Sequence, residues 1–111
     1  MAAMSFREKR RQAKYEKKMA KARKELSLHL FSVAAAEQNA PTHWKIDADA
    51  NREEKERYLE HRMRLRRKWI DKFFEFHPDI DPKIRSELRK EAYEDAEIVR
   101  RNMRAKRDLN P

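Results

Sequence analysis

The sequence predicts an all-α protein of three helices, and three observations support this fold class. The chain of 111 residues contains no Gly, so it lacks the residue that most readily forms tight turns with positive φ angles. Charged residues make up 44% of the chain, and apolar residues recur at the three- and four-residue intervals typical of helices. Pro residues stand beside predicted helix ends rather than within helices. We therefore expect three helices with short connectors.

The first helix is expected from about Ser5 to Gln38, with Pro41 beyond its end. Ser5 and Glu8 have the spacing of a capping box. Residues before Tyr15 show no apolar stripe, so the core of this chain cannot hold them, and they are either frayed or ordered by another molecule. From Tyr15 onward, one apolar stripe is predicted, formed by Tyr15, Met19, Ala22, Leu26, Leu30 and Val33.

The chain is expected to divide into a long basic helix over residues 1–40, a connector over 41–48 and a helical hairpin over 49–111. Trp44 is the prominent apolar residue of the connector. A Trp in a polar loop usually packs back onto a nearby helix, and the alternative is that it anchors in a pocket of a partner. Local packing is the favoured interpretation.

The second helix is expected from about Ala48 to Phe76, with Asp47 or Asp49 as its N-cap and Pro78 beyond its end. Its apolar residues fill close to half of the helix circumference, which is more than packing against one neighbouring helix requires. We therefore expect this helix to be the most buried one, with a partner protein or RNA covering part of it.

The third helix is expected from Asp81 as N-cap and Pro82 as first helical residue to about Arg107. The loop of residues 77–81 is short, so the second and third helices should form an antiparallel hairpin. The third helix carries a thin apolar stripe of Ile84, Leu88, Ala92, Val99 and Met103, supplemented by Tyr93, Ala96 and Ile98. Surface ion pairs along single helices are predicted for Glu53 with Arg57, Glu60 with Arg64, and Glu97 with Arg101.

Basic residues are concentrated at the start of the chain. The first 25 residues contain ten Lys or Arg and three Glu, and so carry +7 of the net charge of +9. Such a basic helix is suited to contacting polyanionic phosphate without reading sequence. The predicted RNA-binding residues are Arg7, Lys9, Arg10, Arg11, Lys14, Lys17, Lys18, Lys21, Arg23 and Lys24, together with Arg64, Arg67 and Lys68 of the second helix.

A second group of residues is expected to contact neighbouring proteins. It combines the large aromatic side chains of the second helix with two Arg residues that project from the middle of the apolar arc. Aromatic and Arg side chains dominate the energetics of many protein interfaces. The predicted interface residues are Trp44, Tyr58, Arg62, Arg66, Trp69, Phe73 and Phe76.

Catalytic and metal chemistry find no support in the residues. Without Gly or Cys, the chain has neither a Gly-rich phosphate loop nor a thiolate site. The segment Asp47-x-Asp49-x-Asn51 begins like a calcium loop, but Arg52 and Tyr58 occupy the positions that require Gly and Glu. The four His residues lack the spacing of metal ligands. We expect no enzyme activity, cofactor, metal, small-molecule substrate or transmembrane segment.

These features favour a non-catalytic structural subunit of a large ribonucleoprotein, a mitochondrial ribosome in the first place, that contacts rRNA and neighbouring proteins. The alternative is an accessory subunit or assembly factor of a mitochondrial respiratory-chain or ATP synthase complex. A membrane-surface protein is the third hypothesis, although residues 1–25 carry few apolar anchors. The expected location is the mitochondrial matrix, with the cytosol or nucleus as alternatives.

Overall fold

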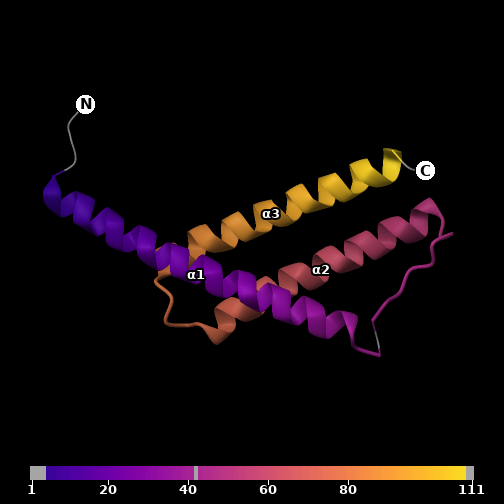
Figure 1. Cartoon of the computed structure of the whole chain (residues 1–111), viewed down its shortest axis with the longest axis horizontal. Helices are drawn as coiled ribbons and strands as arrows, with labels where there is room; N and C mark the ends of the chain where they lie inside the picture. The colour runs from indigo at the N-terminus through magenta and orange to yellow at the C-terminus, as the bar shows by residue number, and fades with distance from the viewer. Residues whose placement is uncertain (1–4, 42, 110–111) are drawn as a thin grey trace.

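The computed structural model describes residues 5–41 and 43–109, which contain three α-helices and no strand. These are α1 (Phe6–Gln38), α2 (Arg52–Phe76) and α3 (Pro82–Leu109). In Figure 1, α2 and α3 lie side by side and antiparallel, while α1 crosses both helices near the loop that joins them. The predicted fold class and the predicted hairpin of α2 and α3 are confirmed.

The starts of α1 and α3 follow from local hydrogen bonds. The Ser5 hydroxyl accepts a hydrogen bond from the Glu8 backbone N–H (3.1 Å), and the Ser5 N–H donates to the Glu8 carboxylate (3.2 Å). This capping box satisfies two donors that a helix start otherwise leaves unpaired. Asp81 accepts from the Lys83 N–H (2.9 Å), and Pro82 is the first residue of α3. Both predicted starts are confirmed.

The predicted start of α2 is wrong by several residues. Its N-cap is Asn51, whose side chain accepts from the Glu54 backbone N–H (2.9 Å). Asp47 instead takes part in a turn in which its carbonyl oxygen accepts from the Ala50 N–H (3.2 Å). The segment between α1 and α2 therefore runs over residues 39–51 rather than 41–48.

The core lies where the three helices meet. The helix α2 supplies five buried side chains, against three from α1 and four from α3, as expected for the most buried helix. His29 of α1 adds a polar contact here, because its Nε2 donates to the Trp69 carbonyl oxygen (3.1 Å). The buried cluster consists of Met19, Ala22, Leu26, Ile70, Phe73, Phe74, Ile84, Leu88 and Ala92.

Phe73 lies at the centre of this cluster and is completely buried. We expected it at a protein interface, and that prediction is wrong. The ring lies 5.6 Å from the His29 ring and 5.2 Å from the Phe74 ring, measured between centroids. The broad apolar arc of α2 is thus covered in part by α1, so this segment of the arc has no surface left for another molecule.

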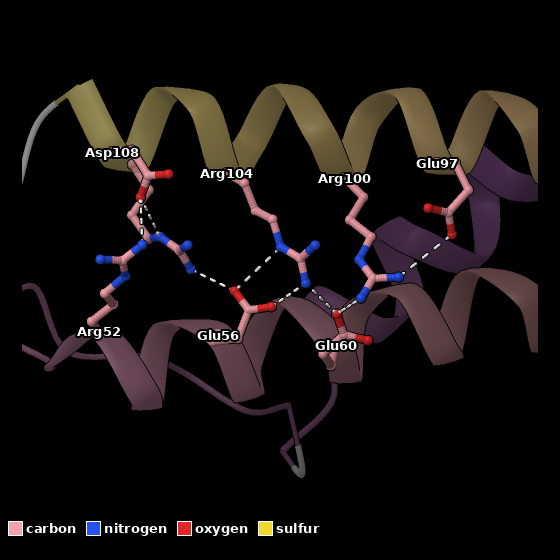
Figure 2. A network of polar contacts seen from close by, with 8 residues as sticks. Arg52, Glu56, Glu60, Glu97, Arg100, Arg104 and Asp108 are labelled. Carbon is pink, nitrogen blue, oxygen red and sulfur yellow. Dashed lines mark hydrogen bonds and ion pairs between the residues drawn. The ribbon is translucent and has the colours of Figure 1, made fainter.

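At the open end of the hairpin, ionic contacts between the helices accompany apolar burial, since Leu59 and Met63 of α2 are buried there. The apolar stripe of α3 is buried as far as Ala96, whereas Val99 and Met103 are about two-fifths exposed. Beyond Ala96, Arg side chains of α3 reach Glu side chains of α2 (Figure 2). The network consists of Arg52 with Asp108, Glu56 with Arg104 and Arg107, Glu60 with Arg100 and Arg104, and Glu97 with Arg100.

These contacts correct the predicted ion pairs along single helices. Glu60 pairs with Arg100 and Arg104 of α3 and not with Arg64. Glu97 pairs with Arg67 of α2 (2.9 Å). No ion pair joins Glu53 to Arg57 or Glu97 to Arg101 within the described ranges. The antiparallel register of α2 and α3 places guanidinium groups of α3 opposite Glu56 and Glu60, and the two hydrogen bonds from Arg104 to Glu56 have favourable bidentate geometry.

Glu56 is the residue of this network whose titration is most perturbed. Hydrogen bonds from Arg104, and then from Arg107, lower its pKa from the ordinary 4.5 to about 2. A depressed carboxyl pKa adds stability that is present above pH 4.5 and is lost as the pH falls toward 2. We expect Glu56→Gln to reduce the free energy of unfolding by about 1 kcal/mol at neutral pH. The loss should shrink between pH 4.5 and pH 2, as measured by thermal or urea unfolding.

The matched control is Glu94→Gln, since Glu94 is an exposed carboxylate of α3 with no ion pair to any described residue. This substitution removes the same charge without touching the network, so its effect on unfolding should be within about 0.5 kcal/mol. Equal unfolding curves for the two variants across this pH range would show that the network does not stabilise the hairpin.

Candidate nucleic-acid interface

The N-terminal part of α1 projects away from the body of the molecule. In Figure 1 the indigo end of α1 continues past the start of α3 without a neighbouring helix. Every residue from Ser5 to Lys14 is exposed, and Phe6 retains 75% of its accessible surface. The capping box of Ser5 and Glu8 begins the helix, but no buried side chain fixes it before Met19. The part of this segment at residues 1–4 lies outside the described residues.

The basic side chains of α1 are almost all without an acidic partner. Of the ten Lys and Arg residues between Arg7 and Lys24, all of which are exposed, nine form no ion pair with a described residue. Arg23 differs, because its guanidinium makes two hydrogen bonds to the Glu91 carboxylate of α3 (2.8 and 3.0 Å). Arg10 lies over the Phe6 ring, 4.9 Å from its centroid, and this contact leaves its charge uncompensated.

Tyr15 marks the point at which α1 meets the body. Its hydroxyl donates a short hydrogen bond to Glu87 of α3, and Lys83 Nζ lies 5.0 Å from the centroid of its ring. The hydrogen bond to Glu87 raises the pKa of Tyr15 to about 12, because ionising the phenol beside a carboxylate is unfavourable. The ring is half-buried and faces α3.

The basic residues of α1 therefore occupy two environments. Lys18 and Lys21 lie beside a shallow depression whose rim also carries Asp79 and Asp81 from the loop between α2 and α3. Their field is partly balanced by these carboxylates. The cations from Arg7 to Lys14 do not line this depression.

The basic residues predicted on α2 differ from one another in exposure and in ion pairing. Arg64 and Lys68 are exposed and form no ion pair with a described residue. Arg67 pairs with Glu97, so its charge is already engaged within the hairpin. Arg62 and Arg66 are half-buried, and one nitrogen of each (Nη1 and Nε) is buried without a hydrogen-bond partner in the described structure.

The aromatic residues predicted at a protein interface also differ from one another in exposure. Trp44 lies against the rings of Tyr58 (5.7 Å) and His61 (5.2 Å) on α2, which agrees with local packing of the connector. Trp69 is half-buried, beside the contact with His29. Phe76 keeps 71% of its surface exposed at the end of α2. Phe76 is thus the most accessible aromatic residue of this group.

Sequence reasoning missed the ionic network of the hairpin, although a signal was present. Arg100, Arg104 and Arg107 recur at four- and three-residue steps on α3, and Glu56 and Glu60 are four apart on α2. Such spacing places each set on one face of its helix. Two oppositely charged faces on adjacent antiparallel helices indicate pairing between the helices.

The described residues contain no group of three or more His, Asp or Glu placed to hold a metal ion. None of their helices combines the length and apolarity needed to cross a membrane. Comparison with protein-family models, with curated proteins and with solved structures finds no match. The function is therefore inferred from the placement and charge of the residues themselves.

Proposed function

We propose that this chain is a non-catalytic structural subunit of a large ribonucleoprotein and that it binds RNA phosphates through the basic N-terminal half of α1. One observation carries the proposal. Nine exposed cations between Arg7 and Lys24 lack acidic partners among the described residues, whereas Arg residues of α2 and α3 pair with five of the twelve carboxylates of these two helices. The helix α1 thus carries the densest run of uncompensated positive charge, with ten basic and four acidic residues, and a polyanion can neutralise it there.

The core holds the middle of α1 in place and leaves its N-terminal half accessible, which favours this role. Met19, Ala22 and Leu26 fasten the middle of α1 to the other helices, and the Arg23–Glu91 pair adds a polar contact. The first turns of α1 extend beyond this attachment as a continuous helix. Cations held at fixed spacing on a helix lose less conformational freedom on binding than cations on a disordered tail.

Protein neighbours would contact parts of the molecule other than the N-terminal half of α1. Phe76 is exposed at the turn of the hairpin, and Trp44 and Tyr58 form an aromatic cluster at the connector. A mitochondrial ribosome in the matrix is the assembly we favour.

The alternative is an accessory subunit or assembly factor of a mitochondrial respiratory-chain or ATP synthase complex. The mixed and internally paired charge of α2 and α3 favours it, because such a hairpin needs no polyanion. The unpaired charge of α1 is then left without a role, which is why we place this function second.

Sedimentation of a cell extract in a density gradient distinguishes the two. As a ribonucleoprotein subunit, the chain should migrate with large particles and shift to light fractions after RNase treatment. Migration with a membrane complex that detergent releases and RNase leaves unchanged would contradict the proposed function and support the alternative.

A further inference from the structure

The side of α1 that points away from the core has an unusual composition. Positions opposite Met19, Ala22 and Leu26 carry no acidic residue, because Glu8, Glu16, Glu25 and Glu37 fall on the other sides of the helix at 3.6 residues per turn. All of its residues are exposed. This outward face of α1 consists of Phe6, Arg10, Ala13, Lys17, Ala20, Lys24, Leu28, Phe31, Ala35 and Gln38, with Lys21 at its edge, on the side of the depression that Asp79 and Asp81 border.

The basic part of the outward face contains no aromatic residue. Phe6 and Phe31 stand at its two ends, and the Arg10 guanidinium lies over the Phe6 ring. Tyr15 is the one Phe, Tyr or Trp residue between Phe6 and Phe31, and it is turned toward α3 and bonded to Glu87. Proteins that hold single-stranded nucleic acid place aromatic rings among the cations, so that successive bases can stack. The outward face offers no such row of rings.

The cations of the outward face form a straight row on a rigid support. Arg10 and Lys24 are separated by about 21 Å along the helix axis, with Lys17 and Lys21 between them. A double helix presents its phosphates at fixed positions and with about twice the charge per unit length of one strand. A flexible strand laid on the same row loses conformational freedom and gains no stacking in return.

We infer that the RNA bound by α1 is double-helical and that the outward face contacts it through phosphates alone. This inference rests on the proposed function and names the class of RNA. We expect no recognition of base sequence by α1, because the major groove of an RNA double helix is too deep and narrow for side chains to reach the base edges. Sequence-independent binding of a stem is the expected behaviour.

Direct binding measurements with the full chain test this inference. The probes are an RNA duplex of about 20 base pairs, long enough to exceed the basic row, and one of its strands chosen to be free of self-pairing. At low salt the duplex should bind about tenfold more tightly than the strand. A second duplex of unrelated sequence should bind with the same affinity.

A Phe6→Ala/Phe31→Ala variant separates phosphate contact from stacking, since both rings are exposed and lie outside the core. The preference for the duplex should persist, whereas a stacking role would weaken binding by about fivefold or more. Equal or tighter binding of the single strand would overturn the inference and leave the proposed function standing. Absence of binding to both RNAs would overturn the proposed function as well.

Discussion

A variant of α1 with six basic residues replaced by Gln is expected to lose most of its affinity for RNA at physiological salt while keeping its fold. Each phosphate contact releases counterions and contributes about 0.9 to the slope of log K against log salt for a duplex, so the loss of Arg10 and Lys17 from the outward face alone should flatten this slope by about 2. Circular dichroism should remain that of a helical protein, because the replaced side chains are exposed. The substitutions are Lys9→Gln, Arg10→Gln, Arg11→Gln, Lys14→Gln, Lys17→Gln and Lys18→Gln.

The control variant removes the same charge from other parts of the surface. Its six replaced residues belong to the connector, α2 and α3, and lie outside the candidate interface. Both variants therefore have a net charge of about +3, and only the position of the lost charge differs. Equal losses of affinity in the two variants would show that overall charge, and not α1, attracts RNA. The control substitutions are Lys45→Gln, Lys55→Gln, Arg57→Gln, Lys72→Gln, Lys90→Gln and Arg101→Gln.

Replacement of Phe73 by Ala is expected to cause the largest loss of stability. The ring is completely buried where the three helices meet and contacts His29 and Phe74. Removing a buried Phe ring costs about 3–5 kcal/mol, which is a large part of the stability of a small domain. We expect the variant to unfold at a much lower urea concentration than the parent chain, with α1 detached from the hairpin.

Phe76→Ala is the matched control, because it makes the same change three residues later on the same helix. Phe76 is 71% exposed, so its removal should change the free energy of unfolding by no more than about 0.5 kcal/mol. Similar urea midpoints for the Phe73 and Phe76 variants would contradict the described packing of α2. Loss of a protein contact in the assembly is the effect expected for Phe76→Ala.

The contrast between the buried Phe73 and the exposed Phe76 shows which features of the structure the sequence could predict and which it could not. The apolar stripe of α1 and the caps at Ser5 and Asp81 were predictable, because helical periodicity and capping depend on neighbours within a few positions. The apolar arc of α2 is so broad that periodicity alone does not say which edge α1 covers. Phe73 lies on the covered edge, and Phe76 does not.

Non-local contacts explain the remaining errors. Asp47, Asp49 and Asn51 are all acceptable N-caps, and the packing of Trp44 on α2 accompanies the use of Asn51. The pairing of Glu60 with α3 rather than with its own helix depends on the register of the hairpin. For the candidate interface, the sequence indicates the charge of α1 and the lack of an apolar stripe before Tyr15, whereas the lack of acidic partners follows only from the arrangement of the helices.

The most direct measurement is the salt dependence of RNA binding by the intact chain. Affinity for a duplex of arbitrary sequence should fall steeply as salt is raised, with a slope of log K against log salt of about −4 or steeper, because several unpaired cations of α1 each contact a phosphate. A slope near zero, or no binding even at low salt, would contradict the assignment of α1 as a phosphate-binding helix.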